Sequence, residues 1–438
     1  MFRIKIFIKA SCLFFIQFIK NICKKLIKIK TQRKRGKMAE IDKIFDSVET
    51  RSLFRDKHII QSNYTPENIP HRDEQMKHIA SILAPSLLGQ KTSNLFIYGK
   101  TGSGKTLSVQ HVANELSKRA SENKILRVEY LNCKLKKVAD TEYRILAELI
   151  KKLGGSVPAT GLPTDQVYLK FLEILENSPE KLLILILDEV DQAVKKINDE
   201  FLYNLTRINS ELKDIQIILV GISNDLRFLD MIDQRVRSSL SEEELVFPPY
   251  NAIQLQDILR KRSEVAFKPG VVSEGVIAKC AAYAAREHGD ARRALDLLRV
   301  AGEIAERNSE SKIKIEHIDQ ANDKIERDKI LDVIESGAKQ FQLVLYSIFK
   351  LSKSKEKNRS IYTGDIFECY EELCKQCKDS CLTQRRVSDI IAELDMLGLI
   401  NARVISKGRH GRMREIRLTI PEGIKEKAKD SLEESLGL

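Results

Sequence analysis

The chain lacks the sequence features of a membrane-spanning or secreted protein. The longest uncharged stretch of its apolar beginning, Ala10–Ile19, is much shorter than the roughly 20 residues that a spanning helix needs. Lys24 and Lys25 follow this stretch, whereas a signal peptide would end in small residues at a cleavage site. The 8 cysteines are scattered through 438 residues, which is not the pattern of a disulfide scaffold. We therefore expect a cytoplasmic protein without a membrane partner.

Acidic residues are absent from the first 37 positions. This segment carries twelve Lys and Arg residues, a charge equal to the formal net charge of +12 for the whole chain. Residues 38–438 are therefore nearly neutral, so an argument for nucleic-acid binding must rest on local basic patches. Two interpretations of residues 1–37 stay open. They form a basic amphipathic helix on a membrane surface, or they are not part of the natural protein, which would then begin at Met38.

Internal repeats and long low-complexity tracts are also absent, and the length favours two to four different domains. Short apolar segments alternate with helix-like segments between residues 94 and 247, which is typical of a parallel sheet with crossover helices. A wholly helical pattern follows, and then several helices with two strands. The predicted strands of the sheet are Asn94–Tyr98, Leu126–Leu131, Leu182–Leu187, Ile215–Val220 and Leu245–Phe247. The predicted domains are residues 38–250, 251–335 and 336–425.

A phosphate-binding loop follows the first predicted strand. Gly99–Thr106 reads GKTGSGKT and matches the pattern G-x-x-x-x-G-K-[ST] completely. Its backbone N–H groups would surround phosphate oxygens, and the N-terminus of the next helix would add a favourable dipole. Lys105 would neutralise the β- and γ-phosphates, while the Thr106 hydroxyl would bind Mg²⁺. The predicted nucleotide contacts in the loop are Gly99, Thr101, Gly102, Ser103, Gly104, Lys105 and Thr106.

Two acidic residues follow the most apolar of the predicted strands. Leu182–Leu187 leads directly into Asp188 and Glu189, at the strand end where parallel α/β sheets bind ligands. Asp188 is predicted to hold Mg²⁺, and Glu189 to polarise the attacking water as general base. The sequence therefore predicts ATP or ADP with Mg²⁺ as ligands, and hydrolysis of ATP as the reaction.

The order of these motifs resembles the AAA+ ATPases of the initiator and clamp-loader branch. The resemblance implies an α/β fold, an AAA+ P-loop ATPase with a five-stranded parallel sheet, followed by a helical lid domain. It implies that Asn224, after the fourth strand, is a first sensor near the γ-phosphate. It also implies that Arg292, at the start of a lid helix, is a second sensor that reaches the phosphates.

Three further nucleotide contacts are predicted with the same resemblance. Arg235 is expected to act as an arginine finger for a neighbouring subunit, with Arg237 as the reserve choice. Tyr250, at the hinge between sheet and lid, is expected to pack on the adenine, with Arg262 one helix further on. Packing of Tyr250 in the core is the alternative.

The C-terminal pattern is typical of a winged-helix domain. The predicted helix Gln384–Leu397 opens with Arg385 and Arg386, as a recognition helix in a DNA major groove would. Two predicted strands follow, Ala402–Ser406 and Arg414–Ile420. A glycine-rich basic tip joins them and contributes two predicted DNA contacts, Arg409 and Arg412. Because small winged-helix domains also bind proteins, a purely protein-binding wing is the alternative.

A closer resemblance joins the chain to archaeal origin-recognition replication initiators. It rests on Tyr64–Arg72, Val246–Tyr250, His288–Leu298 and Leu382–Arg386, and it extends over about residues 45–420. It implies a slow, switch-type ATPase, associated with the nucleoid, that recognises double-stranded origin DNA. It further implies that the protein helps to load the MCM replicative helicase and assembles with paralogous initiators.

The same resemblance implies a second DNA contact within the ATPase domain. The DNA-contacting insertion of the family corresponds to Val157–Lys170, where Thr160, Gly161 and Leu162 are the predicted contacts. These residues are small or apolar, so they are expected to lie against a groove rather than to supply phosphate affinity. The sequence therefore predicts that the insertion and the winged helix bind one duplex together.

Four cysteines close to the winged helix leave two interpretations open. Cys369, Cys374, Cys377 and Cys381 have spacings that would suit zinc or an iron–sulfur cluster. Three of them also fit one face of a helix, so buried apolar thiols are the simpler interpretation.

Two other functions are compatible with the motifs. A clamp-loader or transposition-helper ATPase would share the phosphate loop and sensors, but a clamp loader would end in a helical oligomerisation domain rather than in a basic wing. A transcription regulator would use the ATP site only as a structural switch. Slow turnover with retention of ADP would distinguish an initiator from both.

Overall fold

The structure is a computed structural model that describes most of the chain beyond residue 51. It describes residues 52–62, 64–66, 68–121, 125–134, 141–158, 161–240, 242–354, 360–406 and 412–438. The chain divides into two compact units, Met1–Ile318 and Asp319–Leu438. Within the described ranges, no helix is both long and apolar enough to cross a membrane.

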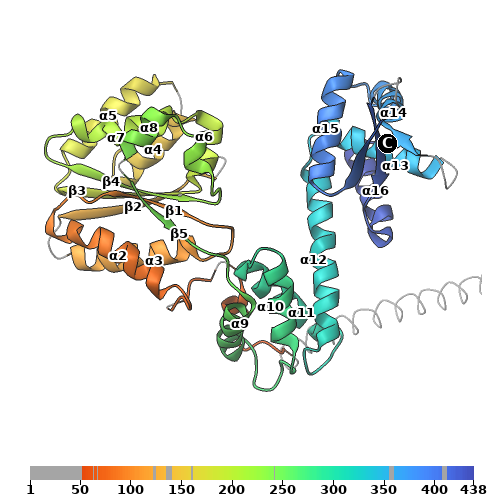
Figure 1. Ribbon diagram of the computed structural model, residues 1–438, viewed down its shortest axis with the longest axis horizontal. Helices are drawn as coiled ribbons and strands as arrows, with labels where there is room; N and C mark the ends of the chain where they lie inside the picture. Colours follow the sequence, from red (N-terminus) through yellow and green to blue (C-terminus); the bar gives the residue numbers. More distant parts are fainter. Residues whose placement is uncertain are drawn as a thin grey trace, which may run out of the picture. The chain divides into compact units, whose positions relative to one another are not determined.

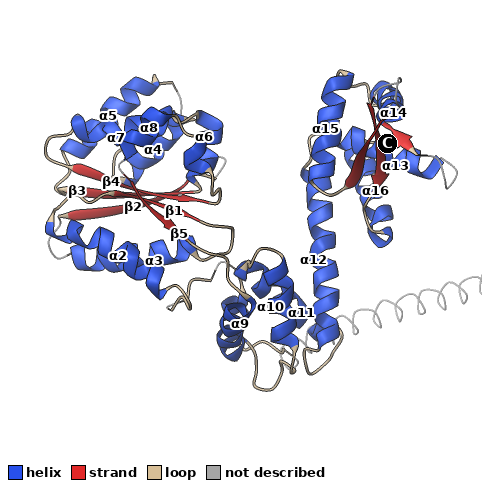
Figure 2. Ribbon diagram, in the orientation of Figure 1, coloured by secondary structure: helices blue, strands red, loops and turns tan. Residues whose placement is uncertain are grey.

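A five-stranded parallel sheet forms the centre of the first unit (Figures 1 and 2). Its strand order is β2-β3-β4-β1-β5, and every neighbouring pair is parallel, as the alternating apolar segments predicted. The strands are β1 (Asn94–Tyr98), β2 (Leu126–Asn132), β3 (Leu182–Asp188), β4 (Gln216–Ser223) and β5 (Glu242–Val246). Strand β5 starts three residues earlier than predicted, because an edge strand pairs through its backbone and can carry the acidic side chains of Glu242–Glu244.

Helices cover both faces of this sheet (Figure 1). Every residue of β3 is buried, which agrees with its uninterrupted Leu and Ile pattern. One face packs against α2 and α3, and the other packs against α4 to α8. These helices are α2 (Asp73–Leu83), α3 (Lys105–Ala120), α4 (Glu142–Lys152), α5 (Thr164–Glu176), α6 (Val190–Ile197), α7 (Glu200–Arg207) and α8 (Gln234–Leu240). The two predicted helices between β2 and β3 are therefore α4 and α5.

The helical lid follows β5 and belongs to the same unit. Its helices are α9 (Ala252–Ala266), α10 (Val276–Arg286) and α11 (Ala291–Arg307). Asn251 starts α9 with a capping box, in which its side chain accepts from the Gln254 N–H and the Gln254 side chain accepts from the Asn251 N–H. Asp290 caps α11 by accepting hydrogen bonds from the N–H groups of Arg292 and Arg293. These two caps fix where the lid helices begin.

The described residues between 52 and 72, here called the N-terminal strap, precede the sheet in sequence but pack on the lid. Phe54 pairs with Phe267 after α9, and their ring centres are 4.6 Å apart. The backbone N–H of Leu53 donates to Glu306 of α11 at 2.7 Å. Arg262 of α9 donates to the carbonyl of Ile59 at 2.8 Å. The strap therefore joins the lid to the first helix of the ATPase sheet.

The second unit contains the C-terminal helices and a small antiparallel sheet (Figure 2). The sheet has the order β6-β8-β7. Its elements are α12 (Ile315–Ser336), which begins just before the unit, α13 (Lys339–Ser354), β6 (Ile361–Tyr362), α14 (Thr363–Gln376), α15 (Gln384–Met396), β7 (Ile400–Ser406), β8 (Arg412–Leu418) and α16 (Glu422–Leu436). The helix–helix–strand–strand order of α14, α15, β7 and β8 is the predicted winged-helix arrangement.

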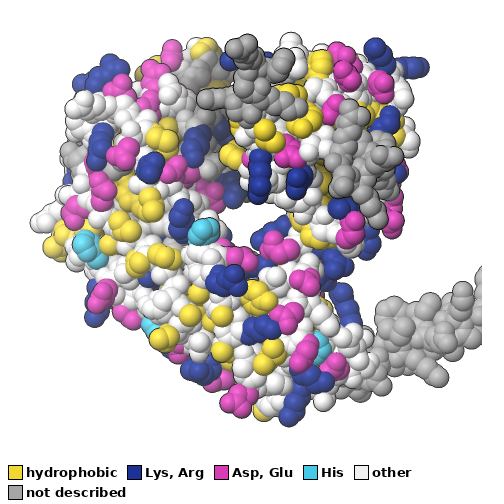
Figure 3. All heavy atoms as spheres, turned by 45° about the vertical axis from the view of Figure 1, so that its right-hand side comes forward, with side chains coloured by type: hydrophobic (Ala, Val, Ile, Leu, Met, Phe, Trp, Pro, Cys, Tyr) yellow, Lys and Arg dark blue, Asp and Glu magenta, His cyan; other side chains and the backbone are white. Residues whose placement is uncertain are grey.

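Acidic and basic side chains are interspersed over the face of the molecule drawn in Figure 3. Exposed Lys and Arg residues alternate there with exposed Asp and Glu residues. This distribution agrees with the near-zero charge of residues 38–438 in the sequence. On this face, a DNA-binding role would therefore depend on particular arginines rather than on a strongly basic patch.

Candidate nucleotide-binding and DNA-binding sites

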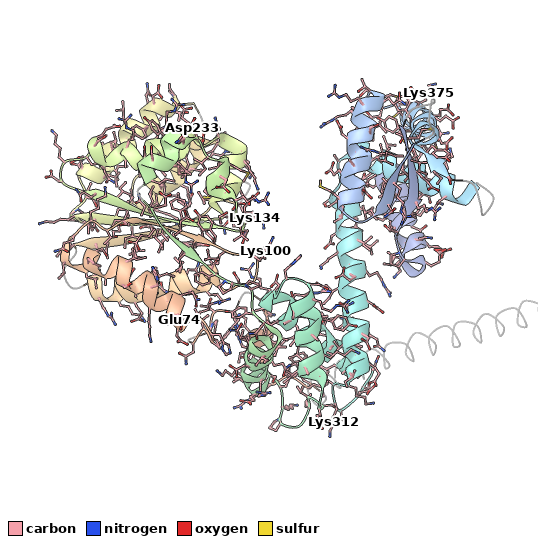
Figure 4. The ribbon with its side chains drawn as sticks, viewed as in Figure 1. Glu74, Lys100, Lys134, Asp233, Lys312 and Lys375 are labelled. Atoms are coloured by element: carbon pink, nitrogen blue, oxygen red, sulfur yellow. The ribbon has the colours of Figure 1, made fainter. Side chains whose placement is uncertain are left out.

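The predicted phosphate loop connects β1 to α3 at the carboxyl edge of the sheet. Figure 4 shows Lys100 of this loop and Lys134, which follows β2, at the same edge. Gly102 and Gly104 adopt left-handed φ angles of 72° and 89°. A Cβ atom at Gly102 would lie 1.7 Å from Oδ1 of Asp290. The glycines are therefore required by both backbone conformation and close packing.

Lys105 points into the loop at the start of α3. Its Nζ donates to the carbonyl of Gly99 at 2.7 Å, to the carbonyl of Lys100 at 3.0 Å and to Oδ1 of Asn224 at 2.9 Å. Burial lowers the pKa of Lys105 to about 8, against the opposing charge of Asp188. The hydrogen-bond partners of this ammonium are thus neutral oxygens, and a bound phosphate would strengthen its charged form.

Asp188 ends β3 and is almost completely buried. Its Oδ2 accepts from the Thr106 hydroxyl at 3.0 Å and from the Tyr130 hydroxyl at 2.7 Å. Thr106 and Asp188, the two predicted Mg²⁺ residues, therefore lie side by side with hard oxygen donors. Among the described residues, no group of three or more His, Cys, Asp and Glu could hold a metal. This donor set fits Mg²⁺, which is commonly bound by one or two protein oxygens together with substrate phosphates.

Glu189, the predicted general base, directly precedes α6 and has a left-handed conformation with φ of 53°. Its carboxylate Oε2 lies 3.4 Å from Nζ of Lys134. The Glu189 side chain is 17% exposed and the Lys134 side chain 70% exposed, so this ion pair lies at the mouth of the site. The role of Lys134 was missed in the sequence, because a lysine after a strand carries no motif.

Asn224, the predicted first sensor, follows β4 and contacts Lys105. Its backbone N–H donates to Oδ1 of buried Asp191 at 3.4 Å. The same Asp191 oxygen accepts from the Ser223 hydroxyl at 3.2 Å. Asp191 was another residue that the sequence did not single out, although it lies three positions after Asp188. It holds the end of β4 so that Asn224 faces the phosphate loop.

One cavity of about 310 Å³ collects the predicted nucleotide residues. Its walls come from the phosphate loop, the strand ends and the lid. The lining includes Thr101, Gly102, Gly104, Lys105, Thr106, Tyr130, Asp188, Glu189, Asn224, Tyr250, Arg262 and Arg292. Exposed Arg292 reaches this cavity from the first turn of α11, and the N–H of Ala291 donates to the Gly102 carbonyl at 3.3 Å.

A second cavity, of about 530 Å³, adjoins the first and shares Pro66, Ile69 and Ile258 with it.

Tyr250 and Arg262 reach this cavity, but both are occupied by the strap. The guanidinium carbon of Arg72 lies 4.0 Å from the centre of the Tyr250 ring, which is only 4% exposed. Arg262 donates to the carbonyls of Ile59 and Tyr64. Tyr250 is therefore packed in the core, which was the alternative, and Arg262 anchors the strap. Both also line the cavity, so their contacts with adenine stay a prediction.

Arg235, the predicted arginine finger, lies on α8 and does not line the cavity. Its side chain is 84% exposed and pairs with Asp233 at 3.2 Å. Arg237 is 45% exposed and pairs with Asp230 and with Glu244 of β5. Arg235 is therefore the freer of the two to reach another molecule.

The predicted DNA contacts are only partly within the described residues. Arg385 and Arg386 are exposed in the first turn of α15, and Arg386 lies 3.7 Å from Asp389. Arg409 lies outside the described residues, and so does the side chain of Arg412 at the start of β8. Arg414 of β8 donates to the carbonyl of Ser388 at 3.3 Å and so joins the wing to α15.

The predicted DNA-contacting insertion, Val157–Lys170, covers the end of the connection between α4 and α5 and the first half of α5. Thr160 lies outside the described residues. Gly161 is exposed with a φ of 107°, and a Cβ atom there would meet nothing within 4 Å. Leu162 is half-buried and packs against the core of the sheet. Of the predicted contacts in the insertion, Gly161 is thus presented to solvent, while Leu162 is largely used in packing.

The four C-terminal cysteines do not form a metal site among the described residues. Cys369 and Cys374 are buried in α14, Cys377 is half-buried and Cys381 is exposed. Burial raises the pKa of Cys374 to about 11. Of the three thiols expected to be buried on one helix face, Cys374 is thus the one that is fully buried.

Family models match three successive parts of the chain. They are an AAA domain at residues 89–229, a Cdc6 AAA+ ATPase-type lid domain at residues 256–323 and the C-terminal winged helix domain of CDC6 at residues 332–428. Together with the sheet, the lid and the cavity, these matches define the chain as an AAA+ ATPase with a Cdc6-type lid and a C-terminal winged helix.

Similar proteins identify the family more narrowly. The ORC1-type DNA replication protein of Pyrococcus abyssi is 49% identical over 391 residues, covering 88% of this chain and 92% of that protein. That of Pyrococcus furiosus is 50% identical over 388 residues, covering 87% and 91%. The structure of the Aeropyrum pernix ORC1 protein in complex with DNA has a TM-score of 0.78 and 43% identity, covering 87% of this chain and 97% of that one. The chain belongs to the family of ORC1-type DNA replication proteins.

Proposed function

We propose that this protein is a nucleotide-controlled replication initiator that recognises origin DNA and helps to load the MCM replicative helicase. The observation that carries the proposal is the single cavity in which Lys105, Asp188, Asn224 and Arg292 meet. These residues come from the sheet and from the lid, so a nucleotide bound between them would hold the two domains together. The AAA+ family implies nucleotide binding and ATP hydrolysis in general.

The phosphates of ATP or ADP would bind over the loop Gly99–Thr106. Lys105 would exchange its carbonyl partners for β- and γ-phosphate oxygens. Thr106 and Asp188 would hold Mg²⁺, which neutralises charge on the phosphates when it is bound. The adenosine would enter the adjoining cavity, where Pro66, Ile69 and Ile258 offer apolar surface.

Hydrolysis would be slow, and the protein would act as a switch that retains ADP. Glu189 is the candidate general base, and Asn224 would orient the attacking water. Lys134 contacts one carboxylate oxygen of Glu189 at 3.4 Å, so this oxygen must be shared before it can accept a hydrogen bond from the attacking water. Arg292 would contact the phosphates from the lid, and Arg235 would serve the site of a neighbouring initiator. Turnover would therefore wait for an assembly with a second copy or with a paralogue.

Origin DNA would be bound by two parts of the chain. Arg385 and Arg386 at the start of α15 are suited to the major groove, and Arg409 and Arg412 to the phosphates or minor groove beside the wing. The insertion at Thr160–Leu162 would touch the same duplex. The DNA complex of the Aeropyrum pernix ORC1 protein supports a DNA-binding role. We place the protein in the cytoplasm on the nucleoid.

The clamp-loader and regulator alternatives have less support. A clamp loader would end in a helical oligomerisation domain, whereas residues 332–428 match a winged helix. A transcription regulator would not need Glu189 and Asn224 beside the phosphate loop. A footprint on the organism's own genome would separate the proposals: an initiator protects one or a few origins, and protection spread over many promoters would contradict initiation.

Two substitutions test the nucleotide site. Lys105→Ala should abolish ATP binding in calorimetry, because the ammonium that counters the phosphates is lost. Glu189→Gln should bind ATP like the wild type but should not hydrolyse it, since an amide cannot act as base. Wild-type ATP affinity in Lys105→Ala would disprove the site.

A further inference from the structure

Arg72, at the end of the strap, is buried to an extent that is unusual for an arginine. Its exposed fraction is 1%, and its guanidinium donates hydrogen bonds to backbone carbonyls. Burial lowers its pKa. A buried charge costs free energy unless hydrogen bonds satisfy it, so the partners of this guanidinium indicate its role.

Those partners belong to the phosphate loop and to the hinge. Nε of Arg72 donates to the Ser103 carbonyl at 2.8 Å, and Nη2 donates to the Pro248 carbonyl at 2.5 Å. The guanidinium also lies over the rings of Tyr250 and Phe247, at 4.0 Å and 5.4 Å from their centres. One side chain therefore holds three segments that are far apart in the sequence.

The contact between Arg72 and Ser103 affects how the loop presents its backbone groups to the phosphates. A loop that binds phosphate must present N–H groups to it and turn its carbonyls away. Arg72 engages the Ser103 carbonyl from behind the loop and keeps it in that orientation. Gly104 leaves room for this arrangement, since a Cβ atom there would lie 2.7 Å from the Tyr250 hydroxyl and 3.7 Å from Nε of Arg72.

The contact between Arg72 and the hinge affects the position of the lid. Pro248–Tyr250 connects β5 to α9, and it packs against Gly289 of the lid, where a Cβ atom would lie 2.3 Å from the Tyr250 carbonyl. Gly289 directly precedes Asp290, the cap of the helix that carries Arg292. Fixing the hinge therefore also fixes the start of α11.

We propose that Arg72 is a positioning residue that couples the phosphate loop to the lid. Arg72 holds Ser103, Pro248 and the Tyr250 ring together. The position of α11 therefore depends on whether a nucleotide occupies the phosphate loop. Nucleotide binding then orders the start of α11 and brings Arg292 to the phosphates. The inference rests on the proposed nucleotide binding and adds a route by which the nucleotide controls the lid.

Calorimetry with ADP and hydrogen–deuterium exchange of the α11 amides test this coupling in the full chain. In the wild type, saturating ADP should slow exchange in the first turns of α11. Arg72→Gln should bind ADP more weakly by about tenfold or more, since two hydrogen bonds to the guanidinium are lost. At saturating ADP, its α11 amides should stay unprotected. Arg72→Lys keeps the charge but can replace only part of the hydrogen-bond geometry. Its ADP affinity and its protection of the α11 amides should therefore lie between those of the wild type and of Arg72→Gln.

Arg127→Gln is the matched control. Arg127 also donates to a backbone carbonyl, that of Lys152 at 2.6 Å, but it lies near the start of β2, away from the carboxyl edge of the sheet. It should leave both ADP affinity and α11 protection unchanged. Normal protection of α11 in Arg72→Gln at saturating ADP would overturn the coupling. If that variant does not fold, Tyr250→Leu, which removes the ring beneath the guanidinium, must show the same loss of protection.

Failure of the two proposals would look different. A wild-type protein that does not bind ADP or ATP would overturn the proposed function, and the coupling with it. A wild type that binds ADP without any protection of α11 would overturn the coupling alone.

Discussion

Lys134 places its ammonium nitrogen 3.4 Å from the carboxylate of Glu189. The pair joins the end of β2 to the end of β3, at the mouth of the nucleotide cavity. The carboxylate oxygen that contacts Lys134 must be shared with this ammonium before it can accept a hydrogen bond from the attacking water. This relationship gives the proposed slow hydrolysis a specific cause within a single chain.

Lys134→Ala should therefore accelerate ATP hydrolysis. Because an exposed ion pair is worth at most about 1 kcal/mol, the increase in kcat should be no more than about fivefold, with KM unchanged. Steady-state phosphate release measures both quantities. Lys151→Ala, which removes a comparable exposed partner of Glu148 away from the cavity, should have no effect. A fall in kcat for Lys134→Ala would instead mean that the ammonium assists the reaction.

ATP affinity should depend on pH through Lys105. The pKa of this group is lowered to about 8 by burial, so the nucleotide-free protein loses the ammonium as the pH rises above 8. Affinity should be nearly constant below pH 8 and should then fall by up to about tenfold per pH unit. Calorimetry in buffers of different ionisation enthalpy should also detect proton uptake on binding above pH 8.

Lys105→Arg is the control for this pH dependence. Its guanidinium stays charged throughout the range, so whatever affinity remains should not change between pH 7.5 and 9.5. A wild-type affinity that is flat to pH 9.5 would show that Lys105 is not the titrating group.

Substitutions in the winged helix should separate sequence recognition from phosphate contact. Arg385→Ala should cost about 1–3 kcal/mol of binding to origin DNA and less to random DNA, because the first turn of a recognition helix contacts base edges. Arg412→Ala should weaken binding to both DNAs and reduce the salt slope by about one unit.

Fluorescence anisotropy at several salt concentrations measures these effects. Lys427→Ala, an exposed position on α16, should change neither affinity nor slope. Equal losses on origin and random DNA in Arg385→Ala would assign Arg385 to the phosphates instead.

Thr160→Ala combined with Gly161→Ala should erode the preference for origin DNA without changing the salt slope. Neither residue carries charge, and Gly161 is exposed in a conformation that a Cβ atom disfavours. Leu162 is left intact because it packs against the core. Binding to both DNAs and bending of the origin duplex are the measurements. An unchanged preference would confine recognition to the winged helix.

The sequence predicted those parts of the molecule whose patterns are local. The five parallel strands, the lid helices and the winged helix follow from apolar periodicity, and α11 begins at the predicted residue because Asp290 caps it. The phosphate loop and the acidic end of β3 follow from short motifs, since neighbouring residues build them.

Features that depend on distant parts of the chain could not be predicted. Nothing in the local sequence says that the strap packs on α9 and α11, or that Arg72 covers the ring of Tyr250. Tyr130 and Asp191 gain their roles only when β2 and β4 lie beside β3. The contacts of Tyr250 and Arg262 with the strap were missed for the same reason.

The strap also determines in which order parts of the chain can fold during synthesis. Leu53 bonds to Glu306, which is 253 positions later in the chain. During synthesis from the N-terminus, the strap therefore has no docking surface until the ribosome has released the whole ATPase sheet and the end of the lid. Contacts of such large sequence separation also form late during folding, because the intervening chain must first be closed into a loop. The nucleotide cavity, whose walls include Pro66 and Ile69, is thus completed only near the end of folding. The proposed nucleotide control therefore becomes possible only after residue 306 of 438 has been made.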